Sequence, residues 1–261
     1  MSHLNSIEDS RKETIAKELA WHEQESQRRL PLDLFLYEPP AFDQVVASGF
    51  DYLQMRPGER VLEMGCGEGK QTLELVQRGM AVVSTDLSHV QLCRAQARLR
   101  ASSPEVKGIF IQANAEALPF ARNSFRLLYG KAILHHLDLD LSAQEVIRVL
   151  QPDGRATFAE PMARHPLFWL ARRLTPKLHT RDEHPLTFSQ LRHFGASFSQ
   201  PEFEEYFLLA PLVYLCRLSG WGEPAFRRLL PHLQRVDRFL FDHLPFLRGL
   251  AWYGVLKMKK A

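Results

Sequence analysis

The sequence has few cysteines and no long apolar run, and both absences exclude classes of protein. Only 3 cysteines occur in 261 residues, far apart and without CxxC or Cys/His spacing, so neither a disulfide framework nor a metal site is predicted. The longest apolar run, residues 206–216, contains a proline and is shorter than the roughly 20 residues of a membrane-spanning helix. The N-terminus is polar and charged, unlike a secretory signal. We therefore expect a cytoplasmic protein.

The chain also lacks a strong excess of charge of either sign. Its 33 lysines and arginines stand against 30 aspartates and glutamates, a formal net charge of +3. That charge is too small to make nucleic acid the expected partner. The composition, 45% hydrophobic and 24% charged, is typical of a globular protein with a packed core.

Short apolar runs alternate with helical patterns from residue 59 onward, which is typical of βαβ units around a parallel sheet. Strands are predicted in seven segments: 60–64, 81–85, 108–112, 125–130, 155–160, 202–207 and 251–258. Helices are predicted at 70–78, 88–100, 141–150, 163–174 and 187–194, with a turn at 151–154. The pattern predicts one doubly wound α/β domain.

The segment VLEMGCGEGK, residues 61–70, is the most informative part of the sequence, because a predicted strand runs directly into glycines and then a helix. Gly65, Gly67 and Gly69 permit positive φ and let the backbone approach a ligand closely. The first N–H groups of the following helix are unpaired and lie at its positive end. We therefore expect a ligand that carries an anionic group.

Two nucleotide-binding patterns can be compared with this loop. A Walker-type phosphate loop would need glycine at Met64 and a hydroxyl at Gln71, so an ATPase is disfavoured. Dinucleotide binding uses GxGxxG, whereas the third glycine comes one residue earlier here. Glu63 would repel a pyrophosphate but would accept from an ammonium group, and Asp86 follows the second strand, where a carboxylate can bind ribose hydroxyls. These features indicate a ligand with an amine, a carboxylate and a ribose; an NAD(P)-dependent oxidoreductase is the alternative.

That description fits S-adenosylmethionine, and residues 59–160 with the terminal strand resemble the class I S-adenosylmethionine-dependent methyltransferases. Five segments match in the family's order: VLEMGCGEG, STDLS, QANAEALPF, FRLLYGKAILHHL and VLQPDGRATFAEP. Two positions depart from the family's pattern, since Asn114 and Arg126 stand where an aspartate is common. The resemblance implies a Rossmann-like sheet of about seven strands, the last antiparallel, and methyl transfer to a small-molecule acceptor.

The resemblance also implies which residues contact the cofactor. The methionine part would lie on the backbone of the glycine loop with an acid near its ammonium, the ribose on a carboxylate, the adenine on the next two loops, and the sulfonium near the end of the fourth strand. The residues for the methionine part are Gly65, Cys66, Gly67 and Gly69, with Glu63 as the acid near the ammonium. Asp86 would bind the ribose, the adenine would contact Leu87, Asn114 and Ala115, and Lys131 would lie near the sulfonium. A helix-capping role is the alternative for Asp86.

Three histidines and a tyrosine are candidates for work on the acceptor. His135 and His136 follow the fourth strand at the carboxyl edge of the sheet, where one of them could remove a proton from a phenol or alcohol. We favour His136, because it lies further towards the open edge, and His184 is a further candidate. Tyr37 could contact the substrate. Packing and loop-orienting roles are the alternatives for all four.

The chain is expected to form three parts of one domain: an N-terminal helical cap at 1–55 with a helix at 6–30, the cofactor-binding core at 56–161, and a C-terminal part at 162–261. Residues 208–249 are too long for a hairpin loop and are predicted to be a helical insertion on the substrate side.

Leucines and phenylalanines recur in this insertion at spacings of three and four between arginines. Packing on the domain's own core, a lid, and contact with an anionic membrane surface are the alternatives for its apolar face. The abundance of Phe, Trp, Leu and Arg outside the core favours an apolar or amphiphilic acceptor. A non-catalytic cofactor-binding scaffold that acts through protein contacts is the other alternative function.

Overall fold

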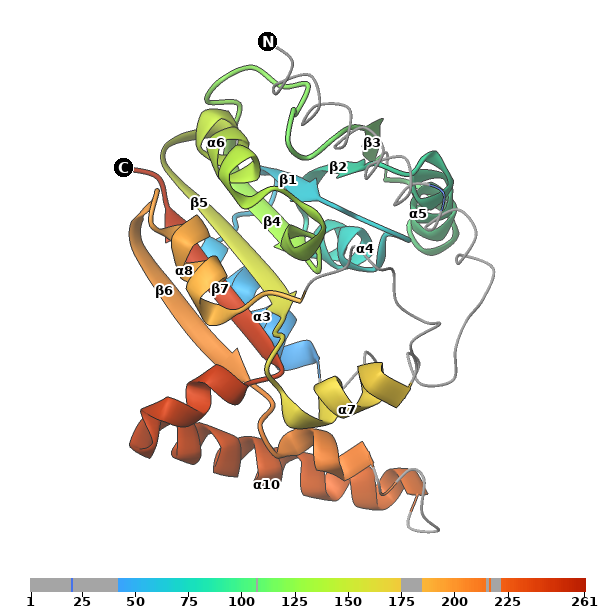
Figure 1. Cartoon of the computed structure of the whole chain (residues 1–261). Helices are drawn as coiled ribbons and strands as arrows, with labels where there is room; N and C mark the ends of the chain where they lie inside the picture. Colours follow the sequence, from blue (N-terminus) through green and yellow to red (C-terminus); the bar gives the residue numbers. More distant parts are fainter. Residues whose placement is uncertain (1–19, 21–41, 107, 175–184, 215, 217–221) are drawn as a thin grey trace.

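The computed structural model describes residues 20, 42–106, 108–174, 185–214, 216 and 222–261 (Figure 1). Seven strands within these ranges form one sheet in the order β3-β2-β1-β4-β5-β7-β6. Their bounds are β1 Arg60–Met64, β2 Ala81–Asp86, β3 Ile109–Gln112, β4 Phe125–Lys131, β5 Leu150–Pro161, β6 Ser199–Tyr206 and β7 Tyr253–Lys259. β7 pairs antiparallel with both of its neighbours, whereas the pairs from β3 through to β5 are parallel. The predicted Rossmann-like sheet with an antiparallel last strand is confirmed.

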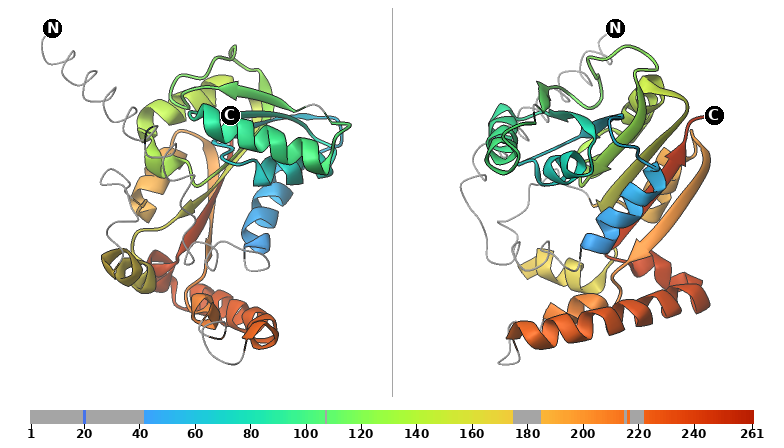
Figure 2. Two further views of the ribbon diagram at one scale, coloured as in Figure 1. Left: turned by 90° about the vertical axis from the view of Figure 1, so that its right-hand side faces the viewer. Right: turned by 180° about the vertical axis from the view of Figure 1, so that it is seen from behind.

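Helices cover both faces of this sheet, as Figure 1 and Figure 2 show from three sides. One face carries α3 (Asp43–Leu53), α4 (Lys70–Gln77) and α5 (His89–Ser102), and the other carries α6 (Leu139–Val149) and α8 (Phe188–Gly195). The remaining helical segments are α7 (Pro166–Leu174), α10 (Gly222–His243) and the short 3-10 helices η1 (Leu134–His136), η3 (Ala210–Tyr214) and η4 (Pro245–Leu250). No helix in the described ranges has the length and apolar character needed to cross a bilayer.

The bounds differ from the sequence prediction mainly around β5. This strand begins at Leu150, which pairs with Phe125 before a register shift, so the predicted turn at 151–154 is an irregular part of the strand. Asp153 within it has a φ of 60°. α7 begins three residues later than predicted, at Pro166, because proline is well suited to the first turn of a helix. The predicted helix at 6–30 lies outside the described residues, except for Ala20.

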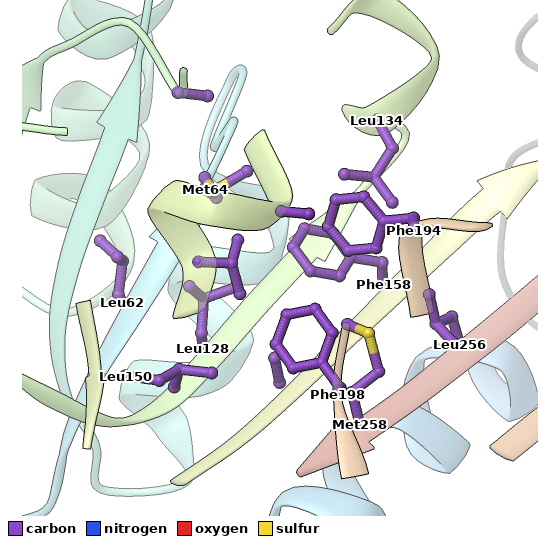
Figure 3. Close-up of a cluster of buried hydrophobic side chains, with 14 of the residues drawn as sticks. Leu62, Met64, Leu128, Leu134, Leu150, Phe158, Phe194, Phe198, Leu256 and Met258 are labelled. Carbon is purple, nitrogen blue, oxygen red and sulfur yellow. The ribbon is translucent and has the colours of Figure 1, made fainter. Parts of the chain in front are cut away.

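The largest hydrophobic cluster lies between the sheet and the helices α6 and α8. In this cluster the strand residues Phe158, Leu256 and Met258 lie beside the rings of Phe194 and Phe198 (Figure 3). Leu134 belongs to the same cluster and is fully buried, although it comes from η1 rather than from a strand. Burial of a leucine side chain stabilises the fold by roughly 1.5–3 kcal/mol. This packing therefore also fixes the short helix that carries His135 and His136.

α10 lies across one end of the β6–β7 pair, at the bottom of Figure 1. Phe226 and Leu230 are buried in a cluster that includes Tyr253, so one face of this helix packs on the chain's own core. Asp237 on the same face accepts hydrogen bonds from the backbone N–H groups of residues 208, 209 and 210 at 2.9, 2.7 and 3.0 Å. Packing on the domain's own core therefore accounts for this face of the insertion. Phe239, on another side of the helix, is 59% exposed.

Candidate active site

A cavity of about 480 Å³ opens at the carboxyl ends of β1, β2, β3 and β4. This is the edge at which α/β sheets bind ligands, and the volume is in the range of small-molecule sites. The glycine loop after β1 forms one wall, the segment from β2 into α5 another, and η1 a third. The cavity brings together ten of the residues predicted from the sequence: Gly65, Cys66, Gly67, Asp86, Leu87, Asn114, Ala115, Lys131, His135 and His136.

The glycine loop is tied to the end of β2 by backbone hydrogen bonds. The N–H groups of Gly65 and Cys66 both donate to the carbonyl of Thr85 at 2.9 Å. Gly67 has a φ of 50°, and its N–H donates to Asp86 Oδ2 at 2.8 Å. Burial raises the pKa of the Cys66 thiol, so Cys66 is a neutral loop residue rather than a reactive thiolate. The loop therefore presents a fixed backbone to the cavity.

Two of the predicted cofactor residues lie behind this loop and do not line the cavity. Glu63 is 2% exposed, and its Oε2 accepts from the hydroxyls of Thr72 at 2.5 Å and Ser84 at 2.7 Å. Burial raises the pKa of Glu63 to about 7. Gly69 has a φ of 76°, and a Cβ at this position would lie 2.7 Å from that of Ala95, so this glycine lets α4 and α5 pack closely.

Asp86 connects the loop to the following helix. Its Oδ2 binds Gly67, and its Oδ1 accepts the N–H of Ser88 at 2.9 Å. The N-cap of α5 is Ser88, whose Oγ accepts from the N–H of Gln91 at 3.3 Å. Each carboxylate oxygen has more than one acceptor position. The carboxylate can therefore hold the loop and still accept hydroxyl groups from a ligand.

Gln91 is a cavity residue that the sequence analysis missed. It lies on the first turn of α5, and its side-chain Oε1 is buried without a hydrogen-bond partner among the described residues. A buried polar atom left without a partner costs roughly 1–3 kcal/mol. A ligand hydroxyl beside Asp86 would supply the partner, so the residues present fit a ribose. The available signal was the position of this amide at the start of the helix that follows Asp86.

The two departures from the family's pattern have separate locations. Asn114 lines the cavity, and its Oδ1 accepts the N–H of Glu116 at 3.0 Å, which shapes the loop that follows β3. Arg126 lies at the start of β4, at the other end of the strand from the cavity, and forms an ion pair with Glu59 at 2.6 Å. The arginine therefore has a local structural partner and no contact with the site.

A buried histidine–carboxylate pair stands on the η1 side of the cavity. His135 Nδ1 lies 2.8 Å from Glu160 Oε2, and the exposed fractions of the two residues are 9% and 0%. The other carboxylate oxygen of Glu160 accepts the N–H groups of Ile133 and Leu134, each at 2.9 Å. A proton on Nδ1 that donates to Glu160 leaves the lone pair of the imidazole on Nε2. The sequence analysis missed Glu160, although an acid at the end of the fifth strand was visible.

His136 also lines the cavity, and its ring packs against that of His135 with the centroids 4.1 Å apart. The preference for His136 in the sequence analysis rested on its position along the chain. The structure gives the carboxylate contact to His135 instead. His184 and Tyr37 lie outside the described residues, and none of the described part of 208–249 lines the cavity.

The sequence of this core matches known methyltransferases. A sequence model described as a methyltransferase domain matches residues 61–154. Methyltransferase GfsG of Streptomyces halstedii is 31% identical over 136 residues, which make up 49% of this chain and 49% of that protein. The chain thus spans about half the length of this relative.

Solved structures share the fold over most of the chain. Geranyl diphosphate C-methyltransferase of Streptomyces coelicolor, in complex with Mg²⁺, geranyl diphosphate and S-adenosylhomocysteine, aligns with a TM-score of 0.59 and 14% identity over 84% of this chain and 79% of that one. The [4+2]-cyclase SpnF aligns with a TM-score of 0.57 and 19% identity over 84% and 80%. Residues 61–154 thus match a methyltransferase domain, and the sheet that contains them has the fold of these solved structures.

Proposed function

We propose that the protein is an enzyme that transfers a methyl group from S-adenosylmethionine to a small, apolar or amphiphilic acceptor. One observation carries the proposal: a single cavity is lined by the glycine loop with Asp86 and Gln91, and also by His135, which Glu160 contacts from behind the wall. The first group of residues has the chemistry of a nucleoside site. The second has the chemistry of a positioned base.

S-adenosylmethionine, when bound, supplies a methyl group on a positively charged sulfur that a nucleophile can displace. The backbone of Gly65, Cys66 and Gly67 holds the methionine part, and Asp86 and Gln91 accept the ribose hydroxyls. The adenine end belongs to three residues of the adjoining loops, namely Leu87, Asn114 and Ala115. Alignment of the two reactants and exclusion of water are the main contributions that the chain must make.

His135 acts where the acceptor is protonated in its ground state, as a phenol or an alcohol is. Nε2 of His135 takes the hydroxyl proton as the oxygen attacks, while Glu160 holds the ring and stabilises the imidazolium that forms. A positioned base of this kind contributes typically 10² to 10⁴ to the rate. His136 keeps a supporting role through its ring contact with His135.

The wall around this pair is mainly apolar, with Ile133, Leu137, Pro161 and Tyr253 beside the histidines. Such a wall suits an apolar acceptor group. The fold neighbour that binds geranyl diphosphate supports this class of acceptor by analogy alone. Tyr37 and His184 stay predictions for the same region.

Each of the two alternative functions is less well supported. The methyltransferase-domain match includes the glycine loop, and this argues against an NAD(P)-dependent oxidoreductase. A non-catalytic scaffold would need the loop and Asp86, but it would have no use for a buried histidine–carboxylate pair on the cavity wall.

Calorimetric titration with S-adenosylhomocysteine and with NADH tests the cofactor assignment. We expect micromolar binding of the first and none of the second; tight binding of NADH alone would overturn the proposal. Release of S-adenosylhomocysteine is then measured with a panel of phenols, fatty acids and isoprenoid alcohols. His135→Ala should lower the rate, whereas His193→Ala, which removes an exposed histidine paired with Asp140 at 2.7 Å, should not.

A further inference from the structure

Lys131 stands apart from the other charged residues of the cavity. It is the last residue of β4, and its ammonium Nζ lies 5.4 Å from the centre of the Phe42 ring. Phe42 is buried at the start of α3, so the side chain of Lys131 runs along the helix-covered face of the sheet rather than into solvent. Among the ion pairs of the described residues, none involves Lys131. A partly buried lysine that forms no ion pair with the described residues needs an explanation.

A second lysine reinforces the positive charge at this point. Lys70, the first residue of α4, also lines the cavity, next to the unpaired N–H groups of the helix N-terminus. Burial and, second to it, the positive charge of Lys70 lower the pKa of Lys131 to about 8, and the carboxylate of Glu74 opposes both effects. Two ammonium groups and a helix N-terminus on one wall favour an anion.

The position of Lys131 in the sheet indicates which anion this is. Asp86 ends β2, and the strand order places β1 and then β4 beside it. Neighbouring strands lie about 4.8 Å apart, so the end of β4 is roughly 10 Å from the ribose-binding end of β2. The glycine loop that follows β1 lies between them. A ligand whose ribose binds Asp86 and whose chain crosses this loop therefore brings its far end to Lys131.

We propose that Lys131, together with Lys70, binds the carboxylate of the methionine part of S-adenosylmethionine. This inference rests on the proposed function and assigns a role to the Lys131 side chain, for which the resemblance implied only a position near the sulfonium. The ring of Phe42 holds the ammonium by a cation–π contact and keeps water from its far side. The bound carboxylate neutralises the positive charge of Lys131, which forms no ion pair with the described residues.

Two ligands that differ only in the amino-acid end, which includes this carboxylate, provide the test. S-adenosylhomocysteine carries the amino-acid carboxylate, whereas 5′-methylthioadenosine lacks the whole amino-acid end and keeps the ribose and adenine. We expect Lys131→Met to raise the Kd of S-adenosylhomocysteine by about tenfold to a hundredfold, the usual effect of losing a charge-assisted hydrogen bond. The Kd of 5′-methylthioadenosine should change by less than about twofold. Lys131→Arg should restore most of the lost affinity.

Lys259→Met is the matched control, since it removes an exposed lysine that pairs with Asp153 and does not line the cavity. Equal weakening of both ligands by Lys131→Met would mean a general disturbance of the site and would overturn the inference. An unchanged affinity for both ligands would also overturn the inference, and Lys131 would then be a candidate to bind an acidic acceptor. If the unmodified protein binds neither ligand, the proposed function itself fails.

Discussion

Two substitutions of Glu160 should separate its contribution to the stability of the η1 turn from its contribution to the chemistry of His135. Glu160→Ala removes the acceptor of three hydrogen bonds, from the N–H groups of Ile133 and Leu134 and from His135 Nδ1. Each buried donor left unpaired costs about 1–3 kcal/mol, so we expect a loss of about 3 kcal/mol or more. Domains are commonly stable by only about 5–15 kcal/mol, so this variant should unfold at a much lower urea concentration.

Glu160→Gln should behave differently. The amide keeps one oxygen that can accept from Ile133 and Leu134, so we expect a destabilisation of about 1 kcal/mol. Its NH₂ group, however, faces Nδ1 of His135 and favours the tautomer with the proton on Nε2. The histidine then has no lone pair for the acceptor, and the methyl-transfer rate should fall by about 10² to 10⁴ while the affinity for S-adenosylhomocysteine is unchanged.

Urea unfolding, calorimetry and turnover on an acceptor from the screen measure these three quantities. Glu205→Gln is the control, because it changes another largely buried carboxylate, on β6, that does not line the cavity. A Glu160→Gln variant with normal turnover would refute the tautomer argument. An unchanged unfolding midpoint for Glu160→Ala would refute the contacts of the turn.

Three further outcomes are expected. Binding of a carboxylate beside Lys131 raises the pKa of this lysine from about 8 towards about 10, so calorimetry should find full affinity for S-adenosylhomocysteine below pH 8 and a loss of affinity above it. Lys131→Arg stays charged and should lose less affinity above pH 8; an identical pH profile for the two proteins would contradict this. Gly69→Ala combines a positive φ with a close contact to α5 and should lower the free energy of unfolding by more than about 1 kcal/mol, whereas Gly249→Ala, where a Cβ meets nothing within 4 Å, should not. If the exposed side of α10 contacts membranes, the protein should co-sediment with phosphatidylglycerol vesicles but not phosphatidylcholine vesicles, and Phe239→Ser should reduce this; no sedimentation with either would exclude the contact.

The parts of the candidate site that follow one another along the chain could be predicted from the sequence. The strand, glycine loop and helix at 60–77 are consecutive, so residue types alone predict their order and the edge at which they meet. The same holds for Asp86 at the end of β2 and for His135 after β4. Their side-chain partners were less accessible, because a contact across the sheet depends on register.

Glu160 and Glu63 illustrate this dependence on register. Lys131 pairs with Ala159 in the β4–β5 ladder, which brings the next residue of β5, Glu160, up to the turn that follows β4. A shift of one residue would have turned the carboxylate to the other face. Glu63 was expected near a ligand ammonium, yet its carboxylate binds hydroxyls from α4 and β2 behind the loop. Neither arrangement can be derived from spacing within a single strand.

The two halves of the cavity are built in different ways, and this bears on how such a fold can support more than one reaction. The loop at β1 and β2 is held mainly by backbone groups, with the N–H groups of Gly65 and Cys66 bonded to the carbonyl of Thr85, so many side chains can change without loss of the loop's shape. The half at β4 and β5 depends on side chains, above all the contact of His135 with Glu160. A few substitutions there can alter the chemistry while the sheet and the loop stay the same. The identity of the acceptor should therefore be sought around His135 and the apolar wall that includes Tyr253, and not in the glycine loop.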